Sequence, residues 1–140
     1  MDLLINIDVP SLAEAVAFYV GAFDLVVTRR LGGAAELSGL PVRLYLLEKP
    51  EGSIGAGADP RRYARHWTPV HFDLVVDDLE SALARAVAAG AKVESPIRVH
   101  VWGKIAILSD PFGNGFCLLQ FLGRGYDEIA DPEPRLLPMV

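Results

Sequence analysis

The sequence contains only one cysteine, Cys117, among its 140 residues. A single thiol cannot form a disulfide within the chain, so nothing here calls for an oxidising compartment. The N-terminal segment MDLLINIDVP has no basic region, and Asn6 and Asp8 interrupt its apolar residues. This pattern does not fit a secretory signal peptide, and we therefore expect a cytoplasmic protein.

Long apolar runs and a basic excess are also missing. No segment approaches the roughly 18 uninterrupted apolar residues of a membrane helix, so we expect no membrane association. The net charge of −5 argues against a nucleic-acid partner, which normally requires a basic stripe. The GAGAD segment lacks the spacing and the preceding strand of a nucleotide-binding glycine loop. What is present is a hydrophobic fraction of 51%, enough for the core of one domain.

Two segments, residues 5–27 and 72–94, resemble each other. Each begins with alternating apolar and polar residues, as in a half-buried strand, and continues with apolar residues at helical spacing. Ser11 or Pro10 is suited to begin the first helix, and Asp77-Asp78 is suited to begin the second. Glycines predict where the helices end: near Gly21 and at Gly90.

More strands are predicted after each helix. In the first half they lie near residues 24–31, 34–38 and 42–48. In the second half they lie near residues 92–94, 98–101, 104–109 and 115–121. The final strands are alike, LYLLE in the first half and FCLLQ in the second. We therefore predict an α+β fold of two βαβββ modules that form a curled mixed sheet around a cavity.

These predictions divide the chain into four parts. Module one covers residues 3–48, and module two covers residues 70–122. The linker, residues 49–69, begins with a Gly/Ser/Pro-rich loop, and its segment Arg61 to Trp67 is compatible with a short helical turn. The tail, residues 123–140, is expected to be an extended arm. Its apolar residues would need cover, for example from a partner subunit; they are Leu136, Leu137 and Met139.

Three motifs carry a family resemblance. A strand is followed by L-x-x-A-x-x-F-Y at residues 12–19, the strand-helix pattern recurs in VHFDLVVDDLESALARAVAAGA, and the second half ends in WGKIAILSDPFGNGFCLLQF. Over residues 3–122 the chain resembles the vicinal-oxygen-chelate superfamily. That superfamily includes glyoxalase I, extradiol dioxygenases, fosfomycin-resistance enzymes, epimerases and bleomycin-sequestering proteins. The resemblance implies that each module provides two ligands to one divalent metal, which acts as a Lewis acid.

Carried over by position, the four ligand sites fall on Leu4, Tyr45, His71 and Cys117. The family pattern has His or Gln, then Glu, at these sites. Leucine cannot bind a metal, tyrosine is rarely a ligand for hard divalent ions, and cysteine suits softer ones. Only His71 fits well. We therefore expect no complete metal site and no cofactor, and Leu4 makes an extradiol dioxygenase the least favoured enzyme.

Other polar residues share the strand faces of these positions. Asn6 and Asp8 lie on the same face as Leu4, and Asp73 lies on the same face as His71. A metal site of His71, Asp73 and Asp8 has suitable ligand types, although residues i and i+2 of one strand are rather far apart. Asn6, Asp8 and Asp73 are therefore candidates for ligand binding.

Several side chains have a structural and a functional interpretation. His71 is either a cavity histidine held by a neighbour or a general acid/base oriented by Asp73. Tyr45 either donates a hydrogen bond to a ligand or fills the cavity. Cys117 is either a small buried residue or, beside His71, a reactive thiol.

The same choice applies to three further candidates. Arg43 meets an anionic ligand or extends into solvent, and Trp102 stacks on a planar ligand or packs on its own turn. The basic cluster of the linker is either a solvated face or a lid over an acidic substrate; it comprises Arg61, Arg62, Arg65 and His66.

Two functions remain open, with a partner-binding domain as a third class. The first is a pocket protein that binds a small organic molecule without metal, as bleomycin-sequestering proteins do. The second is a glyoxalase-type lyase or isomerase that uses His71 as a base or metal ligand and Tyr45 as a donor. In this superfamily, modules commonly pair within or between chains, and the resemblance therefore implies a homodimer.

Overall fold

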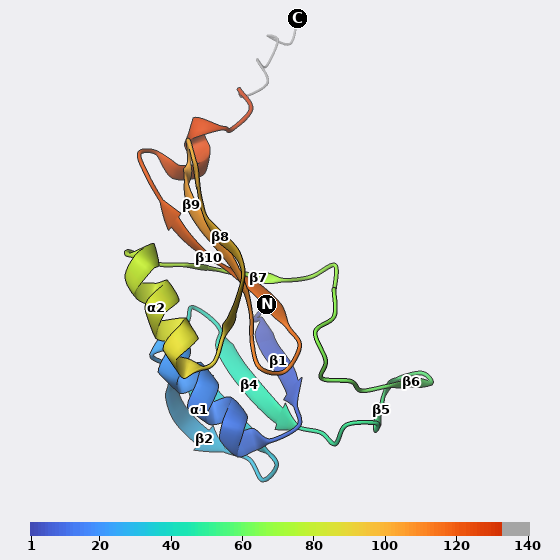
Figure 1. Cartoon of the computed structure of the whole chain (residues 1–140). Coiled ribbons are helices and arrows are strands. Elements are labelled where there is room, and N and C mark those ends of the chain that lie inside the picture. Colours follow the sequence, from blue (N-terminus) through green and yellow to red (C-terminus); the bar gives the residue numbers. More distant parts are fainter. Residues whose placement is uncertain (133–140) are drawn as a thin grey trace, which may run out of the picture.

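The computed structural model describes residues 1–132, and Leu136, Leu137 and Met139 of the predicted arm lie outside them. Two βαβββ modules follow each other along the chain, which confirms the predicted α+β fold (Figure 1). The first module consists of β1 (Leu4–Val9), α1 (Leu12–Phe23), β2 (Val26–Arg30), β3 (Ala34–Ser38) and β4 (Arg43–Glu48). The second consists of β7 (Phe72–Val75), α2 (Leu79–Ala89), β8 (Lys92–His100), β9 (Gly103–Ser109) and β10 (Gly115–Phe121). The linker contains the short hairpin β5 (Ile54–Ala56) and β6 (Asp59–Pro60).

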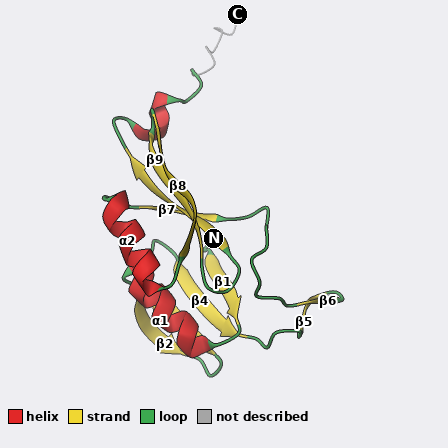
Figure 2. Ribbon diagram, in the orientation of Figure 1, coloured by secondary structure: helices red, strands yellow, loops and turns green. Residues whose placement is uncertain are grey.

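The two modules build sheets of the same topology. Strand order is β1-β4-β3-β2 in the first sheet and β7-β10-β9-β8 in the second. In each sheet the first pair is parallel and the others are antiparallel. Helices α1 and α2 pack against each other, so one core joins the modules (Figure 2). Its largest fully buried apolar residues are Val9, Leu37, Leu46, Leu79, Leu108, Leu118 and Leu119.

The helices begin as the sequence predicts, and for the same reason in both modules. The side chains of Ser11 and Asp78 accept hydrogen bonds from backbone amides in the first turns of α1 and α2. A second cap comes from the last strand of each module. Glu48 accepts from the Leu12 amide, and Gln120 accepts from the Leu79 amide, each at 2.8 Å. The duplication therefore extends to matching side-chain caps.

The predicted end of α1 near Gly21 is wrong, whereas α2 does end at Gly90. Helix α1 continues to Phe23, and Asp24 caps it with a φ of 56°. Gly21 lies inside α1 and faces α2, where a Cβ at this position would lie 3.4 Å from the Cβ of Ala89. The extra turn brings Phe23 to 5.3 Å from Phe116, measured between ring centroids.

The second module also differs from the prediction. Residues 92–94 and 98–101 were expected to form two strands, but β8 is continuous from Lys92 to His100. Register shifts between Val93 and Ser95 and between Ser95 and Arg98 absorb the irregular residues while pairing with β9 continues.

The linker and the start of the tail are the remaining differences. Arg61 to Trp67 contain no helix; instead the Arg61 backbone pairs with Gly52 and Ser53. The expected extended arm contains a 3-10 helix, η1 (Gly125–Glu128). No helix among residues 1–132 combines the length and hydrophobicity that crossing a membrane requires.

The DPFGNG turn joins the two modules through a buried acid. Asp110 is 3% exposed, and its carboxylate accepts from the amides of Phe112 and Asn114 and from the Asn114 side chain. The hydroxyl of Tyr19, on α1, donates to the same carboxylate at 2.5 Å. Burial, and then the charge of Asp110, raise the pKa of Tyr19. The hydroxyl therefore stays protonated and fixes α1 to the turn.

Candidate functional site

A cleft of about 1080 Å³ lies between β1, the linker and the start of β7. Its walls combine apolar side chains with polar groups from both modules. The apolar residues include Ile5, Ile7, Phe23, Leu44, Phe112 and Phe116. Asn6, Asp8, His71 and Asp73 also line it, so four of the predicted ligand-binding and catalytic residues meet here. β1 and β7 are the edge strands of their sheets, and this position gives the cleft its two sides.

The linker is attached to the rim of the cleft by ion pairs. The Nε atom of Arg61 donates to Asp8 at 2.7 Å, and its Nη1 atom donates to the carbonyl of Ile54. Arg65 donates to both carboxylate oxygens of Glu94, on β8, at 2.7 and 2.9 Å. These arginines therefore connect the linker to both modules. Trp67, between them and β7, is 80% exposed.

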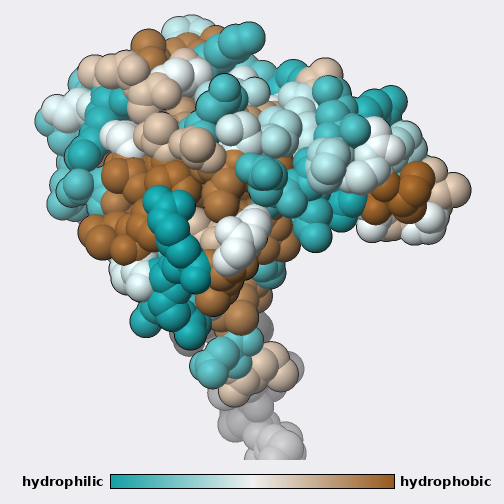
Figure 3. Space-filling view, turned by 90° about the horizontal axis from the view of Figure 1, so that it is seen from below, coloured by the Kyte–Doolittle hydropathy of each residue, from teal (hydrophilic) through white to brown (hydrophobic). Residues whose placement is uncertain are grey.

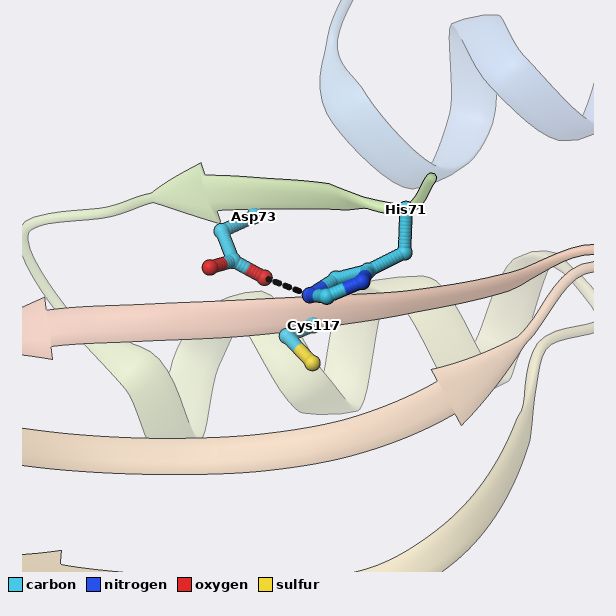
Figure 4. Close-up of side chains that lie close together, drawn as sticks. All are labelled: His71, Asp73 and Cys117. Carbon is cyan, nitrogen blue, oxygen red and sulfur yellow. Dashed lines mark ion pairs between the residues drawn. The ribbon is translucent and has the colours of Figure 1, made fainter. Parts of the chain in front are cut away.

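His71, Asp73 and Cys117 form a cluster at the second module's end of the cleft (Figure 4). Cys117 lies opposite Asp73 in the parallel pairing of β10 with β7, and His71 precedes β7. The His71 Nε2 atom is 3.4 Å from the Asp73 Oδ1 atom. The side chains of His71 and Asp73 are 57% and 37% exposed, which leaves both accessible to a ligand.

Cys117 has the environment of a structural thiol. It is buried on β10 with 8% of its surface exposed. Burial, and then the charge of nearby Asp73, raise the pKa of the Cys117 thiol to about 11. At neutral pH the group is protonated, and a protonated thiol is a poor nucleophile.

The four ligand positions of the family do not meet in one site. Leu4 and Tyr45 line a second hollow, which contains neither His71 nor Cys117. Leu4 has no donor atom, and the Tyr45 hydroxyl donates to Glu36 at 2.6 Å. The residues at these positions therefore do not fit the family's shared metal. Within the second module, His71, Asp73 and Cys117 offer one ligand atom each, all within 4.8 Å of one another.

Glu36 is the main polar residue that the sequence analysis missed. It lies on β3 with 1% of its surface exposed, and its carboxylate accepts hydrogen bonds from four side chains. The donors are Thr28, Arg29, Arg43 and Tyr45, at distances from 2.6 to 3.1 Å. Hydrogen bonds from Arg29, Tyr45 and Thr28 lower the pKa of Glu36 to about 2, so the carboxylate remains ionised.

A β-bulge explains how neighbouring residues of β2 reach one carboxylate. Successive side chains normally point to opposite faces of a strand. The register of β2 against β3 shifts between Val27 and Arg29, which allows both Thr28 and Arg29 to contact Glu36. The available signal was the acid among the apolar residues Ala34, Ala35 and Leu37. Its partners come from two other strands, which the sequence pattern does not connect.

Three of the predicted ligand-binding residues do not line the cleft: Arg43, Trp102 and Cys117, which is buried on β10. Arg43 lines the second hollow and donates to Glu36 at 2.8 Å. Trp102 lines neither cavity. Its ring stacks on His100 at 5.2 Å and packs against Phe121 and Tyr126 of the β10–η1 region. Of the two interpretations of Trp102, these contacts favour packing at its own turn.

Comparison with known proteins agrees with this architecture. The family model described as a glyoxalase-like domain matches residues 4–119. Uncharacterised proteins of Mycobacterium bovis and Mycobacterium tuberculosis are each 32% identical over 117 residues. These matches cover 77% of this chain, and 75% and 67% of the respective relatives.

Solved structures share the fold at lower identity. A glyoxalase/bleomycin resistance protein/dioxygenase family enzyme from Burkholderia phytofirmans has a TM-score of 0.68 and 18% identity, covering 87% of this chain and 100% of that one. The fosfomycin resistance protein FosX from Listeria monocytogenes has a TM-score of 0.67 and 17% identity, covering 86% of this chain and 92% of that one. The family model matches residues 4–119, and the solved structures share the fold of the duplicated modules. The chain therefore belongs to the glyoxalase-like domain family of the vicinal-oxygen-chelate superfamily.

Proposed function

We propose that this protein binds a small organic molecule in the cleft between its modules, without the complete metal site of its superfamily. The cleft carries the proposal. Its volume of about 1080 Å³ is at the upper end of the range of small-molecule pockets. Apolar walls combined with placed polar groups are typical of such pockets. Here the polar lining includes Asn6, Asp8, His71 and Asp73, together with the basic cluster of the linker.

The absence of metal in this proposal rests on residue chemistry. Leu4 offers no ligand atom, and Glu36 already holds the hydroxyl of Tyr45. Binding without a catalytic metal suits a protein that sequesters its ligand, as bleomycin-resistance proteins do. A metal analysis of the purified protein tests this part. A stoichiometric, tightly bound divalent ion would contradict it.

Filling the cleft tests the binding part. In a thermal-shift screen of small aromatic and acidic compounds, hits should raise the melting temperature of the wild-type protein. Val70→Trp places a large ring on the lining of the cleft, where Val70 is 73% exposed, and should abolish these shifts. Val99→Trp is the matched control, because Val99 is 69% exposed and does not line the cleft. Equal shifts in both variants would place the binding site elsewhere.

The alternative is an enzyme of glyoxalase type, a lyase or isomerase. The position of His71 favours it, since its imidazole is accessible from the cleft and Asp73 lies 3.4 Å from its Nε2 atom. Such a pair suits a general base that removes a proton beside a carbonyl group. If the cluster held a metal, His71, Asp73 and Cys117 would bind it, and the ion would supply Lewis-acid activation. His71→Ala should abolish turnover of the substrate, and unchanged turnover would remove this alternative.

We also propose that the protein is a cytoplasmic homodimer. Large apolar side chains are exposed among residues 1–132, including Trp67, Val70, Val99 and Val101. Figure 3 shows hydrophobic side chains gathered between hydrophilic ones on the underside of the molecule, a mixture compatible with a partner contact. Light scattering at micromolar concentration tests this proposal, and a monomer would count against it. Cell fractionation tests the compartment.

A further inference from the structure

The second hollow has a different chemistry from the cleft. It measures about 800 Å³ and lies on the first module. Its polar lining includes Arg29, Arg43, Glu36 and Tyr45, and Leu4 lies beside them. It shares only Pro41 and Val42 with the lining of the cleft. A ligand in this hollow would therefore not depend on occupancy of the cleft.

Glu36 positions two guanidinium groups on one sheet face. Arg29 approaches from β2 and uses Nε and Nη2, while Arg43 approaches from β4 and uses Nη1. The carboxylate between them is 1% exposed and is therefore hidden from solvent. The arginine side chains are 62% and 54% exposed, so their outer parts remain accessible.

The two guanidinium groups carry more donors than Glu36 engages. A guanidinium has five N–H donors in a rigid fork. Within residues 1–132, the side-chain hydrogen bonds of Arg29 and Arg43 all go to Glu36. Nη1 of Arg29 and Nε and Nη2 of Arg43 take no part in these bonds. The hydroxyls of Tyr45 and Thr28 also donate to Glu36, so the carboxylate already accepts from four side chains.

The Glu36 network carries a net positive charge, although Asp2 also lines the hollow. Two arginines and one glutamate leave one positive charge at the network, in a chain whose net charge is −5. Because the glutamate holds both guanidiniums together, little conformational entropy is lost when they engage a ligand. Adjacent arginine forks with free donors recognise carboxylate or phosphate oxygens. We infer that Arg29 and Arg43 form a binding site for an oxyanion, a phosphate or carboxylate group of a small ligand.

Titration with the two oxyanions alone tests this inference. Inorganic phosphate or acetate is added to the full chain at constant ionic strength, and NMR follows the Nε–H signals of the arginines. Saturable shifts of the Arg29 and Arg43 signals are expected. A response to phosphate alone identifies a phosphoryl site, and a response to acetate alone identifies a carboxylate site. If neither anion produces a saturable shift, the inference is wrong.

Variants separate the site from general charge effects. Arg43→Gln should weaken binding by about tenfold, the loss expected for a charged, forked donor. Arg43→Lys keeps the charge but loses the fork, and its affinity should lie between those of the wild type and Arg43→Gln. Arg124→Gln is the matched control, since Arg124 is 71% exposed, pairs with Glu128 and does not line the hollow. If Arg43→Gln and Arg124→Gln weaken anion binding equally, the change in net charge explains the loss, and the inference is overturned.

A final variant acts in the opposite direction. Asp2 also lines the hollow and would repel an anion. Asp2→Asn should therefore tighten binding, and unchanged or weaker binding would count against the site. Circular dichroism of each variant shows whether the fold is retained. Failure of this site leaves the proposal for the cleft intact, because the two cavities have separate tests.

Discussion

The polar clusters of the two modules occupy similar sheets but differ in how completely their groups are paired. In the first module, Glu36 is buried and accepts from four side chains. In the second, His71 and Asp73 are partly exposed and only 3.4 Å apart, and Cys117 is a buried protonated thiol. In the first cluster the buried carboxylate is fully paired and only outer arginine nitrogens remain available, whereas the second cluster leaves its acid and its imidazole accessible. Duplicated architecture therefore constrains the backbone far more than the chemistry of its side chains.

The largest expected effect comes from breaking the first cluster. Glu36→Gln replaces a carboxylate that accepts from two arginines, and should lower the melting temperature by on the order of 10 °C. Val99→Gln on the exposed part of β8 is a control and should change it little. A melting temperature equal to that of the wild type would show that the network does not stabilise the fold.

The same variant has a pH signature. The folded-state pKa of Glu36, about 2, lies below its ordinary value of 4.5. Its contribution to stability is therefore fully present above pH 4.5 and is lost as the pH falls towards 2. The stability difference between the wild type and Glu36→Gln should narrow over this range. Urea unfolding at several pH values measures it, and a constant difference would contradict the assignment.

The next effect concerns the bond that joins the modules. Tyr19→Phe removes the buried hydroxyl that donates to Asp110 and should cost about 2 kcal/mol of unfolding free energy. Asp110 keeps its bonds from Phe112 and Asn114, so the turn should persist. Urea denaturation measures the loss. Tyr126→Phe is the control, because Tyr126 is 48% exposed, and an equal loss in both variants would remove the special role of the Tyr19 hydroxyl.

A smaller effect is expected at the family ligand position of the first module. Tyr45→Phe removes one donor from Glu36 and should cost about 1 kcal/mol, since the remaining donors still satisfy the carboxylate. Urea denaturation again measures the change. If Tyr45→Phe equals Glu36→Gln in its effect, then Tyr45 rather than the arginines is the principal partner of Glu36.

The smallest change in stability, with a clear chemical readout, is expected in the second cluster. The charge of Asp73 and its hydrogen bond contribute, after burial, to the raised pKa of Cys117. Asp73→Asn should therefore lower this pKa and speed alkylation of the thiol by iodoacetamide at alkaline pH. Asp24→Asn is the control, because the Asp24 side chain is 82% exposed and lies on the first module. Identical alkylation profiles in all three proteins would show that burial alone sets the pKa.

The elements of the fold were largely predictable because their signals are local. Ser11 and Asp78 cap helices through bonds within one turn, and the apolar periods of residues 5–27 and 72–94 are visible in the chain itself. The end of α1 was not predictable from Gly21. That glycine meets Ala89 of the other helix, and such a contact has no local signature.

The candidate site was predictable only where residues are close in sequence. Side chains alternate between the two faces of a strand, so the sequence predicts that His71 and Asp73 lie on one face. In the structure their side chains are 3.4 Å apart. Glu36 was missed because its partners come from β2 and β4, and a bulge in β2 lets Thr28 reach it. The family's ligand positions implied that Tyr45 and His71 share one pocket, yet the two residues line separate cavities.

The sequence by itself determined the duplicated βαβββ pattern and the helix caps, because each depends on residue type and short-range spacing. The loss of a ligand atom at Leu4 is what the family resemblance implied. Tertiary structure decided which side chains meet: the Glu36 network, the linker ion pairs at Asp8 and Glu94, and the distance between Tyr45 and the second cluster. The physical reason is that ion pairs and hydrogen bonds act over a few ångströms in space. In the Glu36 network, strand register and the bulge in β2 set those distances, and at Asp8 and Glu94 the path of the linker sets them. The spacing of the residues in the sequence encodes neither.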